Sequence, residues 1–78
     1  MSNNKIYVTI PSDMKEELLT QTFQERTGVA PLSYRLGRNY AIIDLPDGLS
    51  VEKAIEVLNG YEVMGSQLLV EPSLGQNR

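Results

Sequence analysis

The sequence predicts an α+β fold, a two-layer sandwich in which two helices cover one face of a four-stranded antiparallel sheet. Three observations support this prediction. Four short segments alternate apolar and polar residues with a period of two, which is typical of half-buried strands. Two other segments repeat apolar residues at helical spacing. Each of these helical segments has a single apolar stripe, so both helices are expected to bury it against the same sheet.

Length and composition indicate one small domain. The chain has 78 residues, of which 41% are hydrophobic and 22% are charged. A chain of this length buries only about 60% of its unfolded surface, so it needs an efficient two-layer core. We expect residues 5–73 to form the domain, with flexible ends at residues 1–4 and 74–78.

The first strand is predicted over residues 5–10. Its inward face is apolar, and consists of Ile6, Val8 and Ile10. Pro11 should end this strand, because proline cannot continue a central ladder. A helix is expected next, with Ser12 or Asp13 as its N-cap and Glu16 at a spacing similar to a capping box.

This helix should pack on the sheet through an apolar stripe of Met14, Leu18, Leu19, Thr22 and Phe23. Gly28 is expected to close the helix as a C-terminal cap. Two more strands follow at residues 32–36 and 39–45. Gly37 and Arg38 between them predict a tight hairpin with a positive φ at Gly37.

The second helix should begin after Ser50, which can cap it, and end at Asn59-Gly60. Its apolar stripe consists of Val51, Ala54, Ile55 and Leu58. The last strand is predicted over residues 67–71, with Leu69 on the face opposite to Leu68 and Val70. Pro72 is expected to stop it.

The resulting order βαββαβ is that of the ferredoxin-like sandwich, which is built from two split β-α-β units. One face of the sheet is left to water or to a ligand, so function should be sought there. Many functions share this fold, and the fold alone therefore decides none of them.

The segment 54–70 resembles the second helix and final strand of RNA-recognition-motif domains, in its alanine, its Asn-Gly turn, its second glycine and its alternating end. The family also has two short motifs on its central strands. Residues 38–45 keep part of the longer motif as Arg38, Tyr40, Ala41 and Ile43, and residues 6–8 begin like the shorter one. The binding motifs depart from the family at Asn39, Ile42 and Leu45, and Pro11 arrives one residue early.

In this family, aromatic residues of the central strands stack on bases of single-stranded RNA. The resemblance therefore implies a base-stacking face on which Tyr7 and Tyr40 are two platforms and Ile42 takes the third position. Alternation along the strands places further polar and apolar side chains on the same face as the two tyrosines. The predicted RNA-binding residues are Tyr7, Tyr40, Ile42, Lys5, Arg35, Arg38, Thr9 and Leu69. Two platforms at about 1–3 kcal/mol each predict weak binding by a lone domain.

The net charge of −3 is unusual for a nucleic-acid binder. Five of the ten acidic residues lie on the predicted helices, whereas Lys5, Arg35 and Arg38 share the face of the tyrosines. Asp44 and Glu71 are expected to border that face and to repel phosphates. Few phosphate contacts are therefore expected, and with them a shallow salt dependence. By parity, Tyr34 should belong to the core. Tyr61 follows the Asn-Gly that ends the second helix, and is expected to be a packing or loop residue.

The same fold also serves proteins of two other functional classes. A protein-interaction domain of the same fold would use the acidic helical face or the degenerate sheet. An enzyme such as an acylphosphatase-like hydrolase is not expected, because the chain has no histidine or cysteine and Pro11-Ser12-Asp13 occupies the position of a phosphate loop. We expect no cofactor, no metal and no membrane segment. The expected protein is a monomer inside the cell, in nucleus or cytoplasm, with RNA or a protein as partner.

Overall fold

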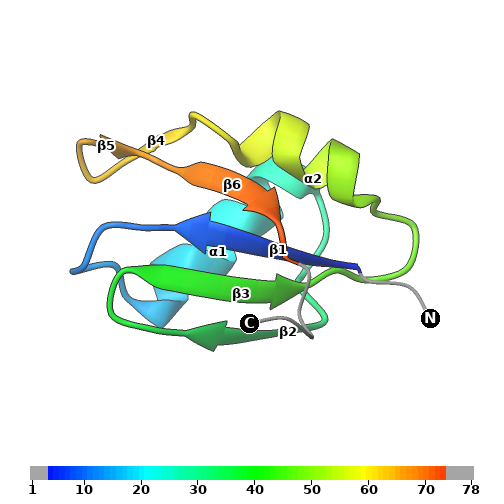
Figure 1. The fold of residues 1–78 in the computed structure, drawn as a ribbon, viewed down its shortest axis with the longest axis horizontal. Helices are drawn as coiled ribbons and strands as arrows, with labels where there is room; N and C mark the ends of the chain where they lie inside the picture. The colour runs from blue at the N-terminus through cyan, green and yellow to red at the C-terminus, as the bar shows by residue number, and fades with distance from the viewer. Residues whose placement is uncertain (1–3, 74–78) are drawn as a thin grey trace.

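The computed structural model describes residues 4–73, which form the predicted ferredoxin-like sandwich. The main sheet has the spatial order β2-β3-β1-β6, and all its neighbouring strands are antiparallel (Figure 1). Its strands are β1 (Lys5–Thr9), β2 (Ser33–Leu36), β3 (Tyr40–Asp44) and β6 (Leu69–Pro72). The other elements are α1 (Glu16–Thr27), α2 (Val51–Leu58), β4 (Glu62–Val63) and β5 (Ser66–Gln67).

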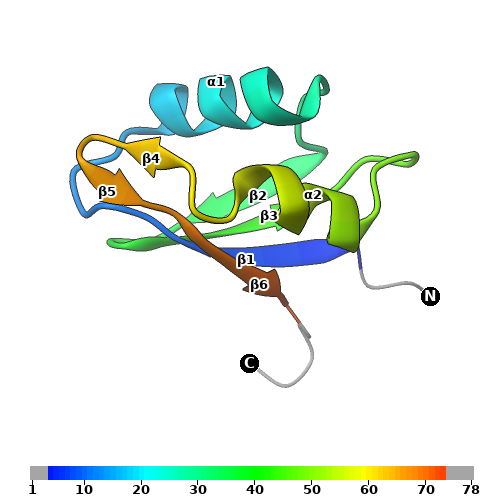
Figure 2. The same cartoon turned by 90° about the horizontal axis from the view of Figure 1, so that it is seen from above.

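Both helices lie on the same side of the sheet, as predicted (Figure 2). The inward side chains of β1 are fully buried, with Ile6 at 0% exposure and Val8 at 1%. Phe23 of α1, Ile43 of β3 and Leu68 before β6 are equally buried and complete the centre of the core. Burial of each such side chain contributes roughly 1.5–3 kcal/mol to stability. Within residues 4–73, no helix lies on the other face of the sheet.

The start of α1 differs from the prediction. The helix begins at Glu16, its N-cap position is Lys15, and no side chain caps it. The Met14 N–H instead donates to the Pro11 carbonyl at 3.1 Å, which forms a turn over residues 11–14. This turn places the Met14 side chain in the hydrophobic core before the helix begins. The capping role predicted for Ser12 or Asp13 is therefore wrong.

The predicted C-terminal end of α1 and both predicted ends of α2 are confirmed. Gly28 adopts a left-handed conformation with φ of 84°, and its N–H donates to the Gln24 carbonyl. The Ser50 hydroxyl accepts a hydrogen bond from the Lys53 N–H at 3.0 Å and caps α2. Asn59 ends α2, and its side-chain oxygen accepts from the Val70 N–H at 2.9 Å. This contact ties the end of α2 to β6.

The last predicted strand is divided in two. Gln67 belongs to a short hairpin of β4 and β5 that the periodicity did not indicate, and the strand of the main sheet begins at Leu69. Two-residue strands are too short for an alternating pattern to stand out. Pro72 does not end β6 early, because it still pairs with Ile6 at the edge of the sheet, where its missing N–H costs no ladder bond.

Tyr61 is a packing residue, as expected. The Arg26 guanidinium lies 4.4 Å above the centre of its ring. The same side chain donates from Nε to the Val57 carbonyl at 2.9 Å, and so joins α1 to the end of α2. Neither helix within residues 4–73 has the length and apolar character that crossing a bilayer requires. The flexible ends expected at residues 1–4 and 74–78 lie outside the described residues, except Asn4, whose carbonyl accepts from the Leu45 N–H.

Tyr34 is only half-buried, so its prediction as a core residue is partly wrong. Its ring packs against the core, and its hydroxyl donates to the Glu16 carboxylate at 2.5 Å. This hydrogen bond is the main reason why the pKa of Tyr34 is raised above its usual value, and burial and the charge of Glu16 add to it. The contact therefore stabilises the fold below pH about 10 and is lost as the pH rises through the raised pKa.

We expect Glu16→Gln to lower the pKa of Tyr34 toward about 10, because the hydrogen bond and the charge that favour the protonated phenol are weakened. A pH titration of the tyrosine ring signals by NMR measures this pKa. Glu17→Gln is the matched control, because Glu17 is the adjacent exposed carboxylate of α1. Equal pKa values of Tyr34 in the wild type and in Glu16→Gln would contradict the assigned contact.

Candidate nucleic-acid interface

The strand register arranges the uncovered side chains of the sheet in three rows. The first row joins β2, β3 and β1, and consists of Ser33, Asp44 and Lys5. The second row crosses all four strands, and consists of Arg35, Ile42, Tyr7 and Glu71. The third row consists of Tyr40, Thr9 and Leu69. Because alternate residues of each strand point inward, these rows follow directly from burial of the other parity.

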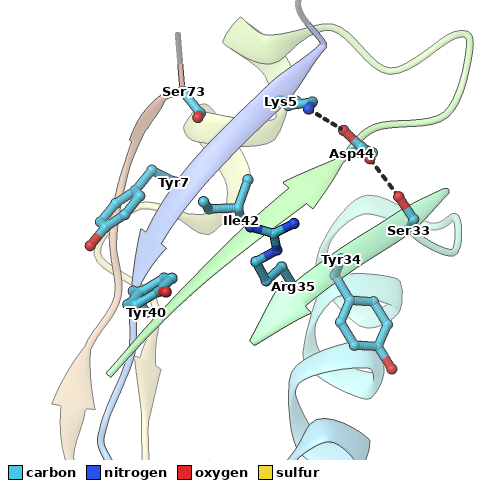
Figure 3. A pocket seen from close by; sticks show the side chains of 9 residues that line it. All are labelled: Lys5, Tyr7, Ser33, Tyr34, Arg35, Tyr40, Ile42, Asp44 and Ser73. Atoms are coloured by element: carbon cyan, nitrogen blue, oxygen red, sulfur yellow. Dashed lines mark hydrogen bonds and ion pairs between the residues drawn. The ribbon is translucent and has the colours of Figure 1, made fainter. Parts of the chain in front are cut away.

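A groove of about 490 Å³ lies over the first row and most of the second, and reaches Tyr40 of the third (Figure 3). Nine residues line it: Lys5, Tyr7, Ser33, Tyr34, Arg35, Tyr40, Ile42, Asp44 and Ser73. Five of the predicted RNA-binding residues are among these nine. Thr9 and Leu69 lie on the same face outside the groove, and Leu69 is 59% exposed. Arg38 is exposed in the turn between β2 and β3 and does not line the groove.

Tyr7 and Tyr40 lie next to each other, as expected for neighbouring central strands. Their ring centres are 5.5 Å apart and their planes differ by 10°, so the two rings are stacked (Figure 3). Tyr7 pairs with Ile42 and Tyr40 with Thr9, which makes the two tyrosines diagonal neighbours. An aromatic pair of this kind contributes about 0.5–1.5 kcal/mol beyond its buried area. Both residues remain partly exposed.

The role of Gly37 differs from the prediction. Its φ is not positive, although four other glycines do have a positive φ. Its N–H donates to the Tyr40 carbonyl at 2.8 Å, and a Cβ at this position would overlap the ring of Tyr40. Glycine is therefore needed here for close approach of an aromatic ring and not for a left-handed backbone. The prediction was wrong because the turn lies one residue further along, at Arg38 and Asn39.

The charged residues of the face are partly paired. The Lys5 ammonium lies 3.7 Å from one oxygen of Asp44, and the Ser33 hydroxyl donates to the other at 2.5 Å. Asp44 was expected to border this face, but Ser33 was missed. Its parity on β2 would have indicated it. Within residues 4–73, Arg35 and Arg38 form no ion pair.

No metal site is found within residues 4–73, where no three acidic, histidine or cysteine side chains gather. The groove offers the stacked rings of Tyr7 and Tyr40, the aliphatic side chain of Ile42, the ion pair of Lys5 and Asp44, and the Arg35 guanidinium. Such a combination suits a planar ligand with a polar edge, because the rings contact its faces and the charged groups its edge.

Comparison with known proteins places this arrangement in a family. Residues 6–69, most of the chain, match the RNA recognition motif. The chain belongs to the RNA recognition motif family. Among the solved structures, that of RNA binding protein PG1 is 28% identical, with a TM-score of 0.72 over 90% of this chain and 93% of that one.

Two other RNA recognition motif structures are similar. Domains 1 and 2 of Sex-lethal from Drosophila melanogaster are 25% identical, with a TM-score of 0.78 over 95% of this chain and 52% of that one. The Rna15 domain with bound RNA (GU) is also 25% identical, with a TM-score of 0.75 over 95% of this chain and 86% of that one. No curated protein matched the sequence.

In this RNA recognition motif, Gly37→Ala should displace the ring of Tyr40 and separate it from Tyr7. We expect a loss of stability of about 0.5–1.5 kcal/mol, the contribution of the aromatic pair. Nuclear Overhauser effects between the two rings report the separation. Asn39→Ala is the control, since Asn39 is exposed in the same turn and contributes a backbone carbonyl to Ile10. Unchanged ring contacts in Gly37→Ala would refute this role of the glycine.

Proposed function

We propose that the uncovered sheet face binds single-stranded RNA by stacking bases on Tyr7 and Tyr40. The observation that carries this proposal is the contact between these two rings beside the groove, on a face that no helix covers in the part of the chain that the structure describes. Because the rings are nearly parallel, two neighbouring bases can stack on them with similarly inclined planes. The contact also restrains both rings before RNA arrives, which lowers the ordering cost of binding.

Phosphate contacts make a smaller contribution than stacking. The positive charge of Lys5 is already paired with Asp44. The negative charge of Glu71, which lies beside Tyr7 on β6, repels phosphates from the same face. Arg35 and Arg38 are then the two cations of this face best able to meet phosphates. Five of the ten acidic residues lie on the two helices, on the side away from the RNA. The proposed binding is therefore weak for a lone domain, and a second domain or flanking segment would strengthen it by raising the effective concentration.

The similar structures favour RNA over other ligands. Sex-lethal is described in a complex with RNA, and so is the Rna15 domain. In this chain the positions of Tyr7 and Tyr40 keep two flat rings, while Ile42 replaces a third aromatic residue. We infer a binder of few bases, because only two flat rings of this face are stacked beside the groove and Ile42 offers a smaller apolar surface.

We expect Tyr7→Leu and Tyr40→Leu each to weaken the binding of short single-stranded RNA about fivefold or more. Leucine keeps an apolar side chain but removes the flat surface that supports about 1–3 kcal/mol per base. Fluorescence anisotropy with labelled RNA measures the dissociation constants.

Met64→Ala is the matched control, because Met64 is a large side chain, 51% exposed, in the separate β4–β5 hairpin. Equal affinities of the wild type and both leucine variants would reject the stacking proposal. Absence of binding to every RNA in a mixed pool would instead favour the protein-interaction alternative.

A further inference from the structure

At one end of the groove, the polar groups of Lys5, Asp44 and Ser33 lie in a row. The Lys5 ammonium lies 3.7 Å from Oδ1 of Asp44, and the Ser33 hydroxyl donates to Oδ2 (Figure 3). These two contacts, on opposite sides of the carboxylate, restrain its orientation. Asp44 remains 34% exposed and Lys5 44% exposed, so a ligand in the groove can reach both.

The carboxylate still has free acceptor sites. An ionised carboxylate offers about four lone-pair positions. The Ser33 hydroxyl occupies one of them on Oδ2, and the Lys5 ammonium, 3.7 Å from Oδ1, forms an ion pair with the carboxylate without a hydrogen bond. The remaining positions can accept two parallel N–H groups, which is the geometry of bidentate carboxylate recognition. The ammonium beside them keeps spare N–H donors. Along this edge, the pattern is therefore donor, acceptor, acceptor.

Guanine carries the complementary pattern. Its Watson–Crick edge presents the O6 acceptor, the N1–H donor and the N2 amino donor in that order. Adenine and cytosine each begin with an amino donor followed by a ring-nitrogen acceptor, which would face the carboxylate unfavourably. Uracil places one N–H between two carbonyl oxygens. Of the four bases, guanine alone matches all three groups.

The position of the ion pair allows one base to use both parts of the groove. Asp44 lies two residues along β3 from Ile42, which is paired with Tyr7. Asp44 is therefore a diagonal neighbour of Tyr7, at a spacing that long side chains and aromatic rings can bridge. A base stacked on Tyr7 can direct its edge toward the first row while its face covers the phenol ring.

We propose that Lys5 and Asp44 recognise the Watson–Crick edge of a guanine that stacks on Tyr7, with Ser33 as a positioning residue for the carboxylate. This inference rests on the proposed function, because it requires RNA on the same face. It assigns to Asp44 a role in base selection, although its charge opposes phosphate binding.

The test uses short uridine-rich RNAs that carry one central guanosine, inosine, adenosine or cytidine. Wild-type protein should bind the guanosine RNA at least about fivefold more tightly than the adenosine and cytidine RNAs. The inosine RNA should fall between them, because inosine lacks only the N2 amino group. Asp44→Asn should abolish the preference, since an amide group replaces one acceptor with a donor.

Glu71→Gln is the matched control, because it removes the same charge from the same face at a position beyond Tyr7. It should keep the guanine preference, and both variants should bind the other RNAs as well as the wild type or slightly better. Equal binding of all four RNAs, or a preserved preference in Asp44→Asn, overturns this inference and leaves the stacking proposal intact. If none of the RNAs binds, both proposals fail together.

Discussion

Burial of alternate side chains of β1 against the two helices is the constraint on which the rest of the structure depends. Ile6 and Val8 are excluded from water at the centre of the sandwich. A shift of one residue would expose both of them, so the register is strongly determined. The same burial turns Lys5, Tyr7 and Thr9 to the uncovered face. The orientation of the proposed binding residues is thus a consequence of core formation.

Pairing across the sheet then converts single residues into a surface. Tyr40 reaches Tyr7 because β3 lies beside β1, and it can lie close to the hairpin because Gly37 has no side chain. Asp44 meets Lys5 and Ser33 for the same reason, since β3 stands between β1 and β2. The face therefore combines an aromatic part, where affinity would arise, with a polar end, where selectivity would arise. Its few unpaired cations are consistent with a chain of net charge −3.

The fold and the shared face of the two tyrosines could be predicted from the sequence, because the outward parity of each strand is a local property and the βαββαβ order places β1 beside β3. Period-two alternation in residues 5–10 was sufficient to orient Tyr7. The role of Gly37 could not be predicted, because it depends on a contact with a ring three residues away. Neither could the contact between Ser33 and Asp44, which requires the register of two strands. The start of α1 was misplaced because capping preference favours Ser12 or Asp13, whereas residues 11–14 form a turn that buries Met14, and the helix begins only at Glu16 without a side-chain cap.

Many functions share the backbone fold of the RNA recognition motif, so the function of this chain must be tested at the two tyrosine rings themselves. The most direct measurement is a set of intermolecular nuclear Overhauser effects between the ring protons of Tyr7 and Tyr40 and the base protons of a bound short RNA. We predict contacts from both rings to bases, with chemical-shift changes concentrated on β1 and β3. Contacts confined to α1 and α2, with both tyrosine rings unperturbed at saturating RNA, would contradict the account.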